Sequence, residues 1–360
     1  MEQQARTKPS NRHGKWQGRR QGSQGGSHNR LRPVSDPLTI VGFPSKGDKT
    51  LLSYDAQKDY YNKIVERYMR FCANNSRDLD TAWTSLVTSA SADPTRNPPT
   101  ARWERPPSAA RESSISGSSV TNSNTLSPGP STPKTASGDD DSSSVHHAAT
   151  ELSTLLMSLR KLREAILATS ATTPVRFAQQ IYIFSIRFSI LARHPPSYFP
   201  SLRHLLDRLH SAAHPLSASE LTEFYSYLIL DYACRQNEMA TAYELLVHAR
   251  RHHRFENVAV EQILAALTHD NWVAFWRTHK SVDGYMRAVI NWATDHVTRQ
   301  ALKAIGRTYL SVNEKWLVGT CTGDEEDRWT WEEFAEKQQL GWQKNGDSVI
   351  IRKMRPKTAS

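Results

Sequence analysis

The chain has 360 residues, a net charge of +10 and only 38% hydrophobic residues, which is below the usual share for a fully globular protein. Its three cysteines, Cys72, Cys234 and Cys321, match no metal-binding or redox spacing, and its most apolar run is too short to span a bilayer. These features argue against a disulfide-stabilised secreted domain and a membrane protein. We expect a soluble protein of the nucleus or the cytoplasm.

Residues 1–50 are rich in Gly, Gln, Ser, Asn and Arg, and residues 1–33 hold eight Lys or Arg against one acidic residue. Such a segment buries too little apolar surface to offset its ordering entropy, so we expect a disordered basic tail. Flexible Arg/Gly segments can contact phosphates and stack on bases. The candidate nucleic-acid contacts in the tail are Arg12, Lys15, Trp16, Arg19 and Arg20. A solvated tail with no specific partner is an equally weighted alternative.

Residues 51–90 form a short segment with helical periodicity. Apolar residues recur at three- and four-residue steps within residues 54–72, which predicts an amphipathic helix, and a second helix is expected over residues 80–87. The first helix either docks back onto the rest of the chain or recognises another subunit. We favour docking back, since half of residues 91–146 are Ser, Thr or Pro. That composition predicts a disordered linker long enough to allow it.

Residues 147–310 carry helical periodicity almost without interruption. The expected helices cover residues 151–167, 176–193, 200–212, 217–235, 239–253, 256–268, 271–280 and 284–310. Pro195 and Pro196 separate the second of these from the third. Short loops favour antiparallel neighbours, so we expect an all-α, right-handed helical-repeat array. No fixed repeat period identifies a particular repeat family.

Residues 311–355 differ from the preceding helices. A short helix is expected over residues 311–317 and another over residues 331–340, followed by an Asn345-Gly346 pair between two extended segments. Asn-Gly in that setting predicts a β-hairpin. The order of three helices and a two-stranded wing is that of a winged helix, and this hairpin is the only β-structure expected.

Two stretches resemble the PCI-domain family, which is named for the proteasome lid, the signalosome and initiation factor three. They are NWVAFWRTHKSVDGYMRAVINWATDHVTRQALKAIGRTYL, and the segment from SVNEKWL to GWQKNGDSVIIRK. They look most like the branch of GANP-type mRNA-export scaffolds and Nin/mts-type lid subunits, although the loop CTGDEEDR is longer and more acidic than usual there. The resemblance implies a scaffold that contacts a second PCI subunit through its winged helix and, in some members, nucleic acid.

No sequence motif predicts catalysis. The chain lacks the phosphate-binding, dinucleotide-binding, zinc-protease and hydrolase motifs, and its 14 histidines have no convergent ligand partners. We therefore expect that the protein is not an enzyme and that it has no catalytic residue, no cofactor and no metal. The cations of residues 250–254 are a further candidate for nucleic-acid contact, and we favour the structural interpretation because the negative end of a helix dipole suffices to explain them.

Exposed aromatic residues at a domain edge are typical interface anchors, so the candidate interface residues are Trp316, Trp329, Trp331 and Phe334. Core packing is slightly favoured for one of Trp329 and Trp331. Acidic residues on the last helix disfavour reading of a DNA groove. The candidate RNA-backbone contacts at the wing are Lys344, Arg352, Lys353 and Arg355. A solvated basic terminus without a partner is an alternative of at least equal weight.

The sequence as a whole predicts a PCI-like scaffold subunit of a multiprotein complex. The basic tail favours an RNA-linked assembly in mRNA export, processing or transcription-coupled events. One alternative is an RNA-binding protein that acts through its tail. Another is a subunit of a proteasome-lid-like or signalosome-like complex without a role in nucleic-acid binding. Other subunits, including a second PCI protein, and RNA are the expected partners.

Overall fold

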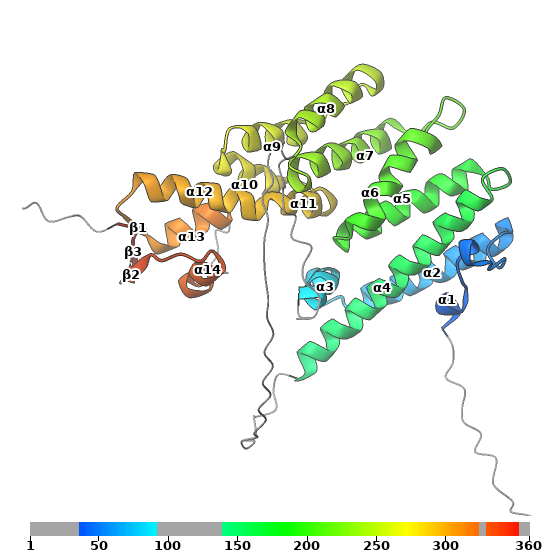
Figure 1. Ribbon diagram of the computed structural model, residues 1–360, viewed down its shortest axis with the longest axis horizontal. Coiled ribbons are helices and arrows are strands. Elements are labelled where there is room, and N and C mark those ends of the chain that lie inside the picture. Colours follow the sequence, from blue (N-terminus) through cyan, green and yellow to red (C-terminus); the bar gives the residue numbers. More distant parts are fainter. Residues whose placement is uncertain (1–35, 92–138, 324–328, 353–360) are drawn as a thin grey trace, which may run out of the picture. The chain divides into compact units, whose positions relative to one another are not determined.

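The computed structural model describes residues 36–91, 139–323 and 329–352, and these form a mostly helical fold with one small sheet (Figure 1). The helices are α1 (Pro37–Ile40), α2 (Tyr54–Asn74), α3 (Leu79–Ser91), α4 (Asp139–Ala168), α5 (Val175–Leu191), α6 (Pro195–His204), α7 (Ala218–Leu230), α8 (Met239–His253), α9 (Val258–Thr268), α10 (Trp272–Ser281), α11 (Gly284–Ile290), α12 (Thr294–Thr308), α13 (Glu314–Thr322) and α14 (Trp331–Lys337). Short 3₁₀ helices are η1 (Pro44–Lys46) and η4 (Asn291–Ala293), and the π-helical segments η2 (Leu205–Leu209) and η3 (Asp231–Arg235) follow α6 and α7. The strands are β1 (Ser311–Asn313), β2 (Gln343–Asn345) and β3 (Ser348–Ile350).

The segment that contains α2 docks onto the helical part of the chain, which is the alternative that the sequence favoured. Helix α2 packs against α4, and its inward side chains Ile64 and Phe71 are buried. The guanidinium of Arg67 donates two hydrogen bonds to the Glu151 carboxylate of α4, at 2.7 and 2.8 Å. Burial of the apolar stripe holds α2 in place and the ion pair fixes its register.

The prediction of disorder was wrong for residues 36–50, at the end of the expected tail, and for residues 139–146, at the end of the expected linker. Leu38 and Leu51 are buried, and the Tyr60 hydroxyl donates to the Leu38 carbonyl at 3.0 Å. These two aliphatic side chains anchor residues 36–50, although the composition around them is polar. Helix α4 similarly begins at residue 139, before the expected boundary at residue 147. The remaining parts of the expected tail and linker lie outside the described residues.

Consecutive helices from α5 onward pack in pairs, α5 with α6, α7 with α8, and α9 with α10. Helix α5 buries side chains around most of its circumference, as its continuous apolar sequence predicts. The prolines at residues 195 and 196 occupy the first turn of α6, where a missing backbone N–H costs nothing. Helix α7 begins with the capping box formed by Ser217 and Glu220.

The single helix expected over residues 284–310 is broken into α11, η4 and α12. Asn291 lies at the break. Its side-chain oxygen is 2.6 Å from Nε2 of His279, and its carbonyl accepts a hydrogen bond from the Thr294 hydroxyl at 2.9 Å. Because these side-chain bonds compete with the helical backbone ladder, the chain changes direction here.

The C-terminal module comprises α12, β1, α13, α14, β2 and β3. The Asn-Gly hairpin is present, and its strands β2 and β3 are joined by a third strand, β1, in the antiparallel order β1-β3-β2. Residues 311–313 were predicted as the start of a helix. They form β1 instead because the Asn313 side chain caps α13, accepting from the Trp316 backbone N–H at 3.1 Å. The module has its own buried cluster, which includes Leu317, Cys321 and Val349.

Gly323 ends α13 with left-handed backbone geometry (φ 73°) and lies against α10. A Cβ atom there would lie 2.5 Å from the Trp276 ring. We expect Gly323→Ala to lower the free energy of unfolding by about 2–4 kcal/mol, because Ala combines backbone strain with a steric clash. The urea denaturation midpoint measures this effect. Gly284→Ala is the control, since open space surrounds that position, and equal stability of the two variants would contradict the close contact.

Candidate functional site

The four aromatic residues predicted to form an interface occupy different environments. Trp331 and Phe334 are 5% and 1% exposed and belong to the core of the C-terminal module, so their prediction as interface anchors was wrong. The Thr330 capping box starts α14 so that positions 331 and 334, one turn apart, both face inward. Trp329 is half-buried, and the Lys337 ammonium lies 4.7 Å from its ring centroid. Only Trp316 remains largely exposed, at 45%.

Trp316 belongs to an exposed apolar cluster that we call the Tyr309 patch, formed by Tyr309, Leu310 and Trp316. Tyr309 and Leu310 are 44% and 43% exposed, and the Tyr309 and Trp316 ring centroids are 5.9 Å apart. Sequence reasoning missed Tyr309 and Leu310 because they read as the last residues of a long helix. An exposed apolar cluster of this kind is typical of a surface that binds another protein.

The cations predicted at the wing have partners within the C-terminal module. The Lys344 ammonium lies 2.8 Å from Oε2 of Glu314 and 3.8 Å from Oε1 of Glu332, and its hydrogen bond to Glu314 raises its pKa. The Arg352 guanidinium donates to the Arg307 carbonyl at 2.5 Å. Nucleic-acid contact by these two residues stays a prediction. In the free protein, Lys344 is already paired with the carboxylates of Glu314 and Glu332. The predicted contacts Arg12, Lys15, Trp16, Arg19, Arg20, Lys353 and Arg355 lie outside the described residues.

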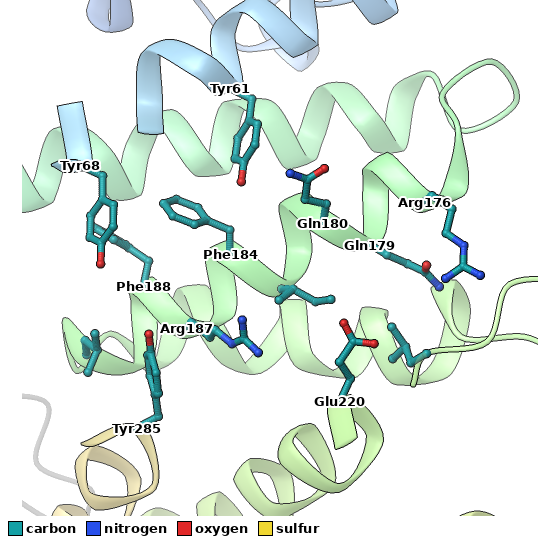
Figure 2. A pocket seen from close by; sticks show the side chains of 13 residues that line it. Tyr61, Tyr68, Arg176, Gln179, Gln180, Phe184, Arg187, Phe188, Glu220 and Tyr285 are labelled. Carbon is teal, nitrogen blue, oxygen red and sulfur yellow. The ribbon is translucent and has the colours of Figure 1, made fainter. Parts of the chain in front are cut away.

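The helical part contains an aromatic groove with a volume of about 480 Å³ between α2, α5, α7 and α11. Figure 2 shows Tyr61 and Tyr68 of α2 projecting toward Phe184 of α5, while Tyr285 of α11 approaches from the other side. The ring centroid of Phe184 lies 5.7 Å from that of Tyr61 and 5.4 Å from that of Tyr68, both edge-on. The Tyr61 and Tyr68 side chains line one wall because the two positions are two helical turns apart.

The arginines around the aromatic groove have hydrogen-bond partners within the protein. The Arg187 guanidinium donates to both carboxylate oxygens of Glu223, at 2.8 and 2.6 Å, and this hydrogen bonding raises the Arg187 pKa. Arg176 donates to the Pro215 carbonyl at 3.2 Å. Burial raises the pKa of Tyr68 and of Tyr285, so both hydroxyls stay neutral. The groove is therefore suited to neutral contacts through aromatic faces and hydroxyls.

Two of the three cysteines are core residues. Cys234 and Cys321 are buried, and burial raises the pKa of the Cys321 thiol to about 12 and also raises that of Cys234. Both thiols stay protonated and act as small apolar groups. Within the described ranges, no three His, Cys, Asp or Glu side chains are arranged to hold a metal ion. No helix in those ranges is long and apolar enough to cross a bilayer.

The chain matches no protein-family model and no curated protein sequence. What it does must therefore be inferred from its fold and its surfaces.

Proposed function

We propose that the protein is a PCI-like scaffold subunit of a multiprotein complex. The observation that carries this proposal is the order of elements. A series of paired helices leads directly into a C-terminal module with the order α12-β1-α13-α14-β2-β3. A winged helix has the order of a helix, a strand, two helices and a two-stranded wing. PCI subunits consist of a helical array that continues into such a winged helix.

The residues that resemble the PCI family fall on these elements. Residues 271–310 cover α10 to α12, and the second stretch covers β1, α13, α14 and the β2–β3 hairpin. The helical array and the module also touch through several contacts, including those of α10 with α12 and α13. This agreement supports the resemblance, because its motifs are packing motifs and they occupy packed positions.

The Tyr309 patch is the surface we assign to the partner subunit. It lies on the C-terminal module, beside the edge strand β1. It combines a leucine with two aromatic rings, Tyr309 and Trp316, and Tyr and Trp are the side chains that anchor interfaces at low entropic cost. Within the proposed function, the partner is a second subunit with an exposed apolar surface of its own.

An RNA-linked assembly is favoured by the concentration of positive charge in residues 1–33. Two other functions remain distinguishable by experiment. A lid-like or signalosome-like subunit would keep its partners and ignore RNA at physiological salt. A protein that acts only as an RNA binder through its tail would lose all associated proteins when RNA is digested.

We expect the double variant Tyr309→Ala, Trp316→Ala to weaken binding to the partner subunit at least about 30-fold, because the two side chains are the anchors of the patch. Val273→Ala is the control, since Val273 of α10 is an exposed apolar residue (52%) that is not part of the patch. The dissociation constant of the purified full-length protein and its purified partner is the measurement. Equal affinity of the double variant and the control would place the interface elsewhere.

A further inference from the structure

Helix α12 carries a row of cations on its solvent-facing side. Arg299, Lys303 and Arg307 are exposed and follow one another at intervals of four residues. They therefore lie along one side of the helix, with a rise of about 6 Å between neighbours. The opposite side is buried in the core of the C-terminal module through residues that include Ala301 and Ile305. The row thus points away from the core and into solvent.

The row keeps its positive charge in the free protein. Among the described residues, no carboxylate lies within ion-pair distance of any of its three cations. The Nε of Arg299 donates to the backbone carbonyl of Asp295 at 3.0 Å. The Asp295 carboxylate itself lies 3.9 Å from the Lys337 ammonium of α14. The one acidic residue of α12 is therefore shared with a cation outside the row.

Arg352 extends the row beyond the end of α12. It is exposed, and its guanidinium donates to the Arg307 carbonyl at 2.5 Å. The acidic groups of the hairpin lie at the other end of β3, where the Asp347 carbonyl accepts from the Glu314 backbone N–H at 2.9 Å and the Glu314 carboxylate pairs with Lys344. The three residues of β3, about 10 Å, separate them from Arg352, so salt weakens their effect on the row.

The elements around α12 do not reverse this balance. Helix α10, which contacts α12, carries Arg277 and Lys280 and no acidic residue. Figure 1 shows α13 between α12 and α14, so α13 separates the row from the acidic residues of α14. Asp270, in the turn between α9 and α10, is exposed near the start of α12. The row and Arg352 together therefore set four cations against this one neighbouring carboxylate.

An aromatic ring lies beside the row. The six-membered ring of Trp342 packs on the backbone of α12 at Gly306, where a Cβ atom would lie 3.1 Å from Cζ2. Gly306 is three residues after Lys303 and seven after Arg299, so it lies on the same side of the helix as both. Trp342 is half-buried. Part of this side chain therefore faces solvent next to the cations.

A solvated helix side is the alternative explanation of such a row, but it leaves the spacing unexplained. Solvated sides usually alternate the signs of charge, as on α2, where Glu66 and Arg70 pair at four-residue spacing. Like charges at that spacing destabilise a helix, and α12 places cations at three successive positions of this kind. A bound polyanion would remove the repulsion.

We propose that the α12 strip, formed by Arg299, Lys303, Arg307, Arg352 and Trp342, binds single-stranded RNA. The charge of the strip identifies the ligand as a polyanion. Trp342 favours a nucleic acid over an acidic peptide, because a base stacks on an indole ring while phosphates contact the neighbouring cations. The inference deepens the RNA-linked part of the proposed function and rests on it for the choice of RNA.

The test measures fluorescence anisotropy of a labelled oligouridylate with the full-length protein between about 50 and 200 mM salt. The triple variant Arg299→Ala, Lys303→Ala, Arg307→Ala keeps the helix, since Ala is the best helix former. It is expected to weaken binding at least about tenfold. It is also expected to lower the slope of log affinity against log salt by about 2, because each lost phosphate contact contributes about 0.7.

The matched control is Lys49→Ala, Lys58→Ala, Lys63→Ala, which removes three exposed cations from the segment that contains α2. The change in net charge is the same as in the triple variant. Because these cations lie outside the strip, affinity is expected to stay within about threefold of the wild type, with a nearly unchanged salt slope.

The stacking role of Trp342 has a separate readout. Trp342→Leu is expected to weaken binding at least about fivefold without changing the salt slope, because it removes a stacking surface and no charge. Trp342→Phe keeps an aromatic face and is expected to retain most of the affinity. Equal affinity of the Leu and Phe variants would contradict stacking on this residue.

Two outcomes would overturn the strip as an RNA site. One is a triple variant that binds like the control, and the other is polyglutamate that competes as well as oligouridylate at equal charge. The tail variant Arg12→Ala, Lys15→Ala, Arg19→Ala, Arg20→Ala separates this failure from that of the proposed function. If only the tail variant lost binding, the strip would fail and the RNA-linked function would stand. If the wild type ignored oligouridylate at physiological salt, both would fail.

Discussion

Asp231→Ala is expected to lower the free energy of unfolding by about 3–5 kcal/mol. Asp231 carries the only buried carboxylate among the described residues, and this carboxylate is the common acceptor of a buried hydrogen-bond network. The Asp231 carboxylate accepts from the Tyr198 hydroxyl at 2.6 Å, from two nitrogens of Arg235 at 2.7 and 2.6 Å, and from the Gln236 amide at 2.9 Å. Without it, the Arg235 guanidinium and the buried Tyr198 hydroxyl lose their acceptor. Urea denaturation, with the m-value compared between variants, measures the loss.

The control for this prediction is Glu66→Ala. Glu66 pairs with Arg70 on the surface of α2, where both side chains are about two-thirds exposed, so its loss is expected to cost less than about 0.5 kcal/mol. If Asp231→Ala were as mild as this control, the network would contribute little to stability. The junction of α6, η3 and the start of α8 would then depend on apolar packing alone.

Ile64→Ala is expected to cost about 2–5 kcal/mol, since Ile64 is fully buried where α2 packs against α4. The cavity would weaken the docking of the whole N-terminal segment. Hydrogen exchange of the α2 amides is therefore expected to accelerate at least as much as that of α4. Met69→Ala on the exposed face of the same helix (62% exposed) serves as the control and is expected to be nearly neutral.

The outcome for Ile64 also distinguishes two roles of α2. A large loss of stability in the isolated chain means that α2 is part of this domain and that the aromatic groove, which α2 helps to form, exists in the free protein. A negligible loss would mean that α2 is loosely held and available to another subunit.

Strongly periodic helices were predicted well from the sequence. Helix α8 has the bounds expected from the sequence, and the ends of α5 and α9 lie within two residues of the expected ones. The Asn345-Gly346 hairpin was also found where expected, because only a tight turn suits that pair between extended segments. In these segments local preference and tertiary packing favour the same structure.

The errors arose where a few long-range contacts outweigh local composition. Leu38 and Leu51 order residues 36–50, yet a composition average over that segment detects too little apolar surface. Strand β1 has only three residues and exists because β3 pairs with it. The break at Asn291 depends on a hydrogen bond with His279, which the sequence does not reveal.

The interface residues show the same limit. Trp316, Trp329 and Trp331 read alike in the sequence, because each lies near a short helix at the end of the chain. Only the packing of α14 into the core of the C-terminal module, where it contacts α13, separates the buried Trp331 from the exposed Trp316. Helical spacing assigns a residue to a face, but which face is covered depends on elements that are distant in the sequence.

The most direct test of the scaffold function is native mass spectrometry of the tagged full-length protein, purified from its own cells and treated with nuclease. The proposal predicts a complex of fixed stoichiometry that survives the nuclease, that contains another subunit with a helical array and a winged helix, and that dissociates in the Tyr309→Ala, Trp316→Ala variant. A protein that emerges from nuclease treatment as a free monomer, with every associated protein lost, would contradict the proposal.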